Sequence, residues 1–62
     1  MIVQFTENIA ATPVYVNPEY VVSVKPDPEN PDTVARIKLR DGEELTVRGD
    51  PEVVARKLEG EA

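Results

Sequence analysis

The sequence predicts an α+β fold, an antiparallel meander of about five strands with one C-terminal helix packed on one face. Two observations predict this fold. Short segments rich in β-branched residues alternate between apolar and polar positions, and turns containing Pro, Gly, Asn or Asp separate them, as in antiparallel strands. Near the end of the chain, after Pro51, the apolar residues are instead spaced for one face of a helix. The 62 residues are expected to form a single small domain, 1–62.

Four strands are expected at residues 2–6, 12–16, 21–25 and 33–39, and a fifth strand includes Leu45 and Val47. The side chains expected to point inward are Val3, Phe5, Val14, Val16, Ala35, Ile37 and Leu39. Tyr15 falls on the opposite, outer face. Residues 7–11, ENIAA, form a weak connection between the first two strands.

The segment Asn17 to Tyr20 is expected to form a tight turn into the third strand. Asn17 can cap a single helical turn, and Pro18 can open that turn because the first helical position needs no backbone N–H donor. The turn is too short to continue as a helix, so the chain is expected to return to a strand at once.

Residues 26–32, PDPENPD, contain three prolines and predict a stiff acidic loop on the surface. The oxygen-bearing side chains Asp27, Glu29, Asn30 and Asp32 are candidates for a calcium site. A calcium loop of the helix-loop-helix type needs ligands at alternate positions, a central glycine and a bidentate glutamate, and this segment has prolines instead. We therefore expect a solvated acidic turn and no metal site.

The last two strands are expected to form a hairpin whose apolar residues share one buried face. A two-residue loop, 41–42, would pair Leu39 with Glu44 and place a carboxylate in the core. A three-residue loop, 40–42, avoids this pairing and puts Gly42 in the left-handed position of a type I turn with a bulge. Burial therefore favours the longer loop, which predicts the pairs Ala35–Val47, Ile37–Leu45 and Lys38–Glu44.

Residues 48–50 form an Arg-Gly-Asp tripeptide, which also occurs as a cell-adhesion ligand. That role would need an extracellular protein and a flexible loop, and the sequence has neither a signal peptide nor a cysteine. A strand-to-helix turn explains the same residues, because Gly49 frees the backbone, Asp50 caps the helix and Pro51 opens it. We therefore expect a helix from Asp50 to Leu58 and no adhesion role.

The composition argues against several classes of protein. Without Cys or His, the chain has no disulfide and lacks the common zinc and haem ligand sets. No apolar run approaches the roughly 20 residues that span a bilayer, so we expect no membrane insertion and a cytoplasmic location. The sequence has no glycine-rich phosphate loop, and Ser23, the single serine, lies within a strand. We expect no enzymatic activity and no cofactor.

Two surfaces are candidates for binding. Exposed aromatic residues are enriched at the centres of interfaces. The predicted protein interface therefore consists of Ile2, Tyr15, Tyr20 and Val34. In the other interpretation, these residues only cover the second face of the sheet. The candidate contacts for nucleic acid are the cations of the last hairpin, Arg36, Lys38, Arg40 and Arg48. Glu44 opposite Lys38, the lack of interleaved aromatic residues and the formal net charge of −5 favour a solvated, ion-paired face instead.

Several short matches from Val14 onward carry a resemblance to a known family. The matching residues are 14–19, Val22, Val24, 31–33, 37–39, Gly42, Val47 and 52–54. They resemble the FlbD-type (SwrD) family of small bacterial flagellar proteins, which implies a non-enzymatic cytoplasmic accessory protein that acts through contacts. The chain departs from that family at residues 7–11, where ENIAA replaces a turn containing glycine, and in its longer loop at residues 26–32. The last hairpin and helix also resemble the end of the LytTR DNA-binding domain, over a smaller part of the chain.

A chain of this length buries a small core, which favours self-association. We therefore expect a small protein-interaction or structural accessory module that forms a homodimer, with an unknown protein partner. The alternative is a nucleic-acid-binding accessory protein that uses the outer face of the last hairpin.

Overall fold

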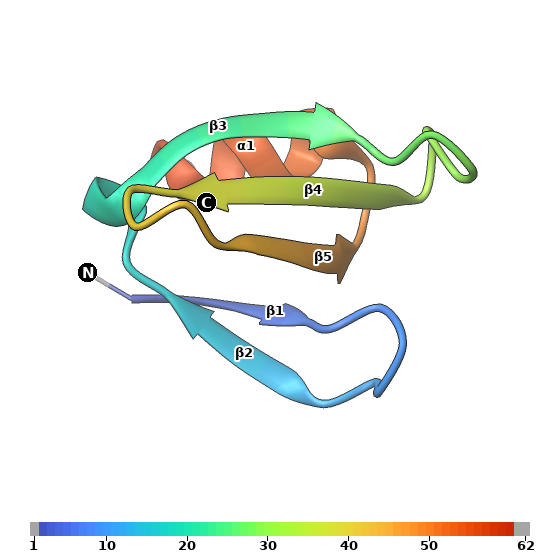
Figure 1. Cartoon of the computed structure of the whole chain (residues 1–62), viewed down its shortest axis with the longest axis horizontal. Helices are drawn as coiled ribbons and strands as arrows, with labels where there is room; N and C mark the ends of the chain where they lie inside the picture. The colour runs from blue at the N-terminus through green and yellow to red at the C-terminus, as the bar shows by residue number, and fades with distance from the viewer. Residues whose placement is uncertain (1, 61–62) are drawn as a thin grey trace.

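The computed structural model describes residues 2–60, which form five strands, one short 3-10 turn and one C-terminal helix (Figure 1). The elements are β1 (Val3–Thr6), β2 (Pro13–Val16), η1 (Pro18–Tyr20), β3 (Val21–Pro26), β4 (Val34–Leu39), β5 (Glu44–Arg48) and α1 (Pro51–Leu58). The predicted α+β class, with antiparallel strands followed by one helix, is confirmed.

The strands divide between two sheets, β1-β2 and β3-β4-β5, and do not form one continuous meander. The 3-10 turn η1 separates β2 from β3, so these strands do not pair. Instead, β1 lies beside β5, where a single β-bridge joins Glu7 to Val47 and the Asn8 N–H donates to the Thr46 carbonyl at 2.9 Å. Figure 1 shows the β1-β2 hairpin below β5, while α1 lies behind β3 and β4.

One apolar core connects both sheets and the helix. Its buried members are Phe5, Val16, Ala35, Ile37, Val47 and Val54. Ile37 and Val47 have no exposed surface, and the Lys57 Nζ lies 5.8 Å from the centre of the Phe5 ring. The inward positions predicted for Phe5, Val16, Ala35 and Ile37 are confirmed. Because each layer contributes to the same cluster, neither sheet buries its apolar face alone.

The hairpin between β4 and β5 has the predicted register. Ala35 pairs with Val47, Ile37 with Leu45 and Lys38 with Glu44. The Leu39 N–H donates to the Glu43 carbonyl at 2.8 Å, which closes a three-residue loop in which Gly42 has a φ of 92°. The choice of the longer loop, made to keep a carboxylate out of the core, is confirmed.

The helix α1 begins as predicted from the tripeptide. The Asp50 Oδ1 accepts a hydrogen bond from the Glu52 N–H at 2.8 Å, and Pro51 occupies the first turn. Gly49 has a φ of 137°, and a Cβ at this position would lie 3.3 Å from the Val54 Cγ2. Gly49 thus supplies both the backbone conformation and the space that the entry to the helix requires.

The two connections near the N-terminus are ordered turns. At η1, the Asn17 Oδ1 accepts from the Glu19 N–H at 3.0 Å, which confirms the predicted cap. In the β1-β2 turn, the Glu7 carboxylate accepts from the Ala10 N–H at 2.8 Å, and Ala11 adopts a left-handed φ of 59°. Ala11 therefore occupies a conformation that usually favours glycine.

The helix α1 contains eight residues, and no helix within residues 2–60 is long and apolar enough to cross a membrane.

Candidate functional site

An apolar groove of about 290 Å³ lies where β2, η1 and the β4–β5 hairpin meet. Its lining residues are Tyr15, Val16, Asn17, Tyr20, Leu39 and Leu45. In Figure 1 these elements meet at the left end of the molecule. The structure therefore brings together Tyr15 and Tyr20, two of the four residues of the predicted protein interface.

The two tyrosines are held by different elements. Tyr15 lies opposite Gln4 in the β1-β2 ladder and is 67% exposed, whereas Tyr20 ends η1 and is 52% exposed. The Tyr20 carbonyl accepts from the Arg40 N–H at 2.8 Å, which fixes η1 to the tip of the hairpin. The groove thus has an anchored backbone and a half-exposed aromatic rim, which is typical of surfaces that bind another protein.

The β2 edge beside this groove has no strand partner within the described chain. At the end of the β1-β2 ladder, the Glu7 N–H donates to the Thr12 carbonyl at 2.8 Å. Hydrogen-bonded and non-hydrogen-bonded residue pairs alternate along an antiparallel ladder. Because Glu7 and Thr12 are hydrogen-bonded, the pair of Gln4 and Tyr15, three positions along the ladder, is a non-hydrogen-bonded pair. The N–H and C=O of Tyr15 therefore point to the open edge, where they are free to pair with another strand.

This edge is also the longest uncharged part of the sequence. Residues 8–18 contain no charged side chain, although charged residues make up 31% of the chain. Natural sheets usually protect an open edge with charged residues, and β2 has only Pro13 for this purpose. The most exposed large apolar residue, Ile9 at 86%, lies in the same run.

The other two predicted interface residues do not line the groove. Ile2 is 61% exposed and directly precedes β1, so it stays an accessible candidate. Val34 is only 5% exposed, and its predicted place on an accessible surface is wrong. The loop of residues 26–32 folds against the start of β4, where the Val34 N–H donates to the Asn30 carbonyl at 3.0 Å and its carbonyl accepts from Asp27 at 3.1 Å.

The predicted cations of the last hairpin lie close together. The ladder register places Arg36, Lys38 and Arg48 on the sheet face opposite the core, because Ala35, Ile37 and Val47 point into it. Lys25 pairs with Arg36 and joins them from β3, and Arg40 lies in the loop at the tip. Sequence reasoning missed Lys25, because the register between β3 and β4 depends on a bulge between Val21 and Ser23.

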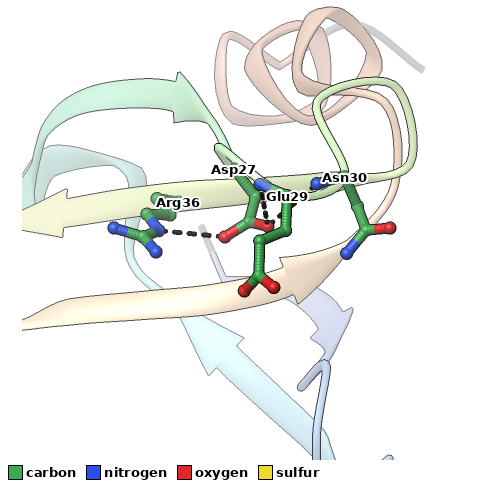
Figure 2. Close-up of polar contacts among 4 residues, drawn as sticks. All are labelled: Asp27, Glu29, Asn30 and Arg36. Carbon is green, nitrogen blue, oxygen red and sulfur yellow. Dashed lines mark hydrogen bonds and ion pairs between the residues drawn. The ribbon is translucent and has the colours of Figure 1, made fainter.

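The acidic loop contains one buried carboxylate, Asp27, which is 6% exposed (Figure 2). Its Oδ2 accepts from the N–H groups of Glu29 and Asn30, each at 3.1 Å, and its Oδ1 accepts from the Arg36 Nε at 3.1 Å. Burial raises the pKa of Asp27, but the Asn30 N–H, the Arg36 guanidinium and the Glu29 N–H outweigh it and hold the pKa below 3.8. The expectation of a fully solvated acidic turn is therefore wrong for Asp27.

The same contacts leave little room for a cation at Asp27, because both of its oxygens already accept hydrogen bonds from protein donors. Within residues 2–60, no group of three or more Asp and Glu side chains is arranged to hold a metal ion.

Two further features were not anticipated from the sequence. Leu39 and Leu45, assigned to the core, are partly buried: they pack against the core and also line the groove. A second depression of about 350 Å³ lies between β3 and the end of α1, with Val22, Ala55 and Leu58 among its lining residues. Val22 reaches 61% exposure because it lies at the β3 bulge, and no local sequence pattern marks that bulge.

No family model, curated protein or solved structure matches this chain. The resemblance to FlbD-type flagellar proteins therefore stays a prediction.

Proposed function

We propose that this protein is a small non-enzymatic interaction module that forms a homodimer through the β2 edge and the Tyr15–Tyr20 groove. The observation that carries the proposal is the open edge of β2, which bears an exposed Tyr15 and no charged residue. In a two-fold pairing centred on Tyr15, the Tyr15 N–H of each copy donates to the Tyr15 carbonyl of the other. The β1-β2 hairpins of the two copies then form one continuous antiparallel sheet.

The distribution of charge supports a second copy as the partner. A chain with a net charge of −5 repels its own copies wherever acidic surfaces meet. Residues 8–18 avoid this repulsion, since they bring no charge to the contact. Burial of Tyr15, Ile9 and the groove would add apolar area that so small a core lacks.

Sedimentation equilibrium over a wide range of protein concentration tests the proposal. The wild-type protein should form a dimer at micromolar concentration, and Tyr15→Asp should be monomeric because two carboxylates would face each other across the two-fold axis. Val22→Asp is the matched control, because Val22 is 61% exposed on the other outer strand, β3. Circular dichroism should show that both variants fold.

A wild-type protein that stays monomeric up to millimolar concentration would overturn the proposal. So would a Val22→Asp variant that dissociates while Tyr15→Asp remains dimeric, since the contact would then lie on the β3 side. A cytoplasmic location belongs to the same proposal, and fractionation of cells that express the tagged chain tests it.

The alternative function, nucleic-acid binding through Arg36, Lys38, Arg40 and Arg48, has less support. One nitrogen of Arg36 and one of Arg48 already donate to protein oxygens, those of Asp27 and of the Asn8 carbonyl. The described aromatic residues lie on β1, β2 and η1 and none lies on β4 or β5, so no ring alternates with these cations for bases to stack on.

A further inference from the structure

The outer face of the β3-β4-β5 sheet is a second surface, distinct from the β2 edge. Cross-strand pairing places side chains in rows, with Lys25, Arg36 and Thr46 abreast in one row and Ser23, Lys38 and Glu44 in the next. Val34 and Arg48 form a third row beside Asp27. Arg36 is therefore at the centre of the face.

Charge on the molecule is segregated toward this face. It holds four of the seven cations, Lys25, Arg36, Lys38 and Arg48, and only two carboxylates, Asp27 and Glu44. Its formal charge is thus +2, which leaves −7 on the rest of a chain whose net charge is −5. No cation of this face except Arg36 has an ion-pair partner within the described residues.

Arg36 is oriented before any ligand arrives. Its Nε donates to the Asp27 Oδ1, and Asp27 is fixed in turn by the backbone of its own loop. In Figure 2 no contact is drawn to either terminal nitrogen of Arg36, and its side chain is 40% exposed. A guanidinium held through Nε keeps a planar pair of terminal donors, which matches the two oxygens of a carboxylate.

We infer that this outer face binds an acidic peptide segment of a partner protein, with Arg36 receiving a carboxylate and Lys25 and Lys38 flanking it. The segment is rich in Asp or Glu and lies in extended form across the three strands. Ser23 and Thr46 lie in the same rows as the cations and offer hydroxyl groups to such a segment.

The size of the face favours a short acidic peptide over nucleic acid. Three strands of about five residues cover roughly 10 Å by 17 Å. A nucleic acid would run past this area onto a surface with a formal charge of −7, within a molecule of only 28 × 26 × 20 Å. Phosphates that reach this surface would lie within the Debye length of its carboxylates, about 8 Å at physiological ionic strength, so salt would not screen the repulsion.

Fluorescence anisotropy with a labelled tetra-glutamate peptide, which is about 14 Å long when extended and so fits the face, tests the inference at low ionic strength. Binding should weaken with added salt, and Lys25→Gln, Lys38→Gln and Arg36→Gln should each weaken it about threefold or more. Arg56→Gln is the matched control, because Arg56 is an exposed cation on α1, away from the sheet face, and should bind like the wild type. Arg36→Lys should lose affinity although it keeps the charge.

A second arm uses a labelled ten-nucleotide oligo-dT under the same conditions. Tighter binding of oligo-dT than of tetra-glutamate would overturn the inference in favour of nucleic acid. Absence of tetra-glutamate binding by the wild type would also overturn it. So would equal losses of affinity in Arg56→Gln and Lys38→Gln, because binding would then depend on net charge alone. Tyr15→Asp separates the two surfaces, because it should dissociate the dimer without abolishing tetra-glutamate binding.

Discussion

Asp27, in the loop that follows β3, and Arg36, on β4, are joined by a 3.1 Å contact between Oδ1 and Nε, with the carboxylate buried and the guanidinium partly exposed. The pair ties the acidic loop to the centre of β4. Because Asp27 also accepts from two backbone N–H groups of its own loop, one side chain determines both the shape of the loop and the orientation of Arg36.

This pair should make stability depend on pH in the acid range. The pKa of Asp27 is held below 3.8 in the folded protein, so the ionised carboxylate stabilises the fold above the unfolded pKa, near 3.8. That contribution is lost as pH falls through the lower, folded pKa. Urea unfolding of the wild type and of Asp27→Asn should therefore differ most at neutral pH and converge as the pH falls below 3.8. Asp32→Asn, an exposed neighbour, should keep the wild-type profile.

Replacement of Ala11 by glycine should stabilise the protein. Ala11 has a φ of 59°, and a left-handed conformation costs a residue with a Cβ roughly 1–2 kcal/mol. Glycine removes that strain but has greater freedom in the unfolded chain, so the expected net gain is about 0.5–1 kcal/mol. Thermal unfolding measures the gain. Ala10→Gly should give no stabilisation, because Ala10 does not have a positive φ.

Alanine substitutions at Gly49 and Gly42 distinguish the cost of backbone strain from the cost of a steric contact. Both have positive φ, so alanine at either position should cost on the order of 1–3 kcal/mol. At Gly49 the new Cβ would also lie 3.3 Å from the Val54 Cγ2, whereas at Gly42 it would have open space. The free energy of unfolding should thus fall further for Gly49→Ala than for Gly42→Ala, by about 1 kcal/mol. Equal losses would mean that α1 shifts to accommodate the methyl group.

The capping role of the tripeptide predicts a loss of stability in Asp50→Ala. The lost hydrogen bond to the Glu52 N–H should reduce the free energy of unfolding by about 1 kcal/mol. Arg48→Ala replaces an exposed residue of the same tripeptide and should change the free energy of unfolding by less than about 0.5 kcal/mol. Chemical denaturation of both variants checks this, and the reverse order of effects would contradict the capping interpretation.

Local rules predicted much of this fold. The β4–β5 register followed from keeping Glu44 out of the core, and both the Asn17 and Asp50 caps followed from local hydrogen bonding. The same rules failed where distant segments meet. The burial of Val34 depends on a loop that folds back on β4, and the pairing of β1 with β5 depends on residues about forty positions apart.

The candidate surfaces were predictable to a similar degree. Tyr15 was placed on the outer face by alternation alone, and the grouping of Arg36, Lys38 and Arg48 followed from the register. The groove itself was not predictable, because residues of β2 and η1 meet Leu39 and Leu45 of the last hairpin only in the folded chain. The buried position of Asp27 was also missed, since an acidic segment rich in proline gives no sign that one carboxylate is enclosed.

The single Glu7–Val47 bridge has a consequence for how the molecule opens. Side-chain packing, the hydrogen bond from Arg48 to the Asn8 carbonyl and this one backbone link, with its neighbouring hydrogen bond, hold the β1-β2 hairpin to the rest of the described chain. The hairpin should therefore detach as a cooperative unit at lower free energy than global unfolding, while β3-β4-β5 and α1 stay assembled. Native-state hydrogen exchange should show two classes of amides, with Phe5 and Val14 exchanging well before Ile37. A detached hairpin could also pack onto a second copy of the chain, so the exchange of strands between two copies would begin with opening of the Glu7–Val47 bridge.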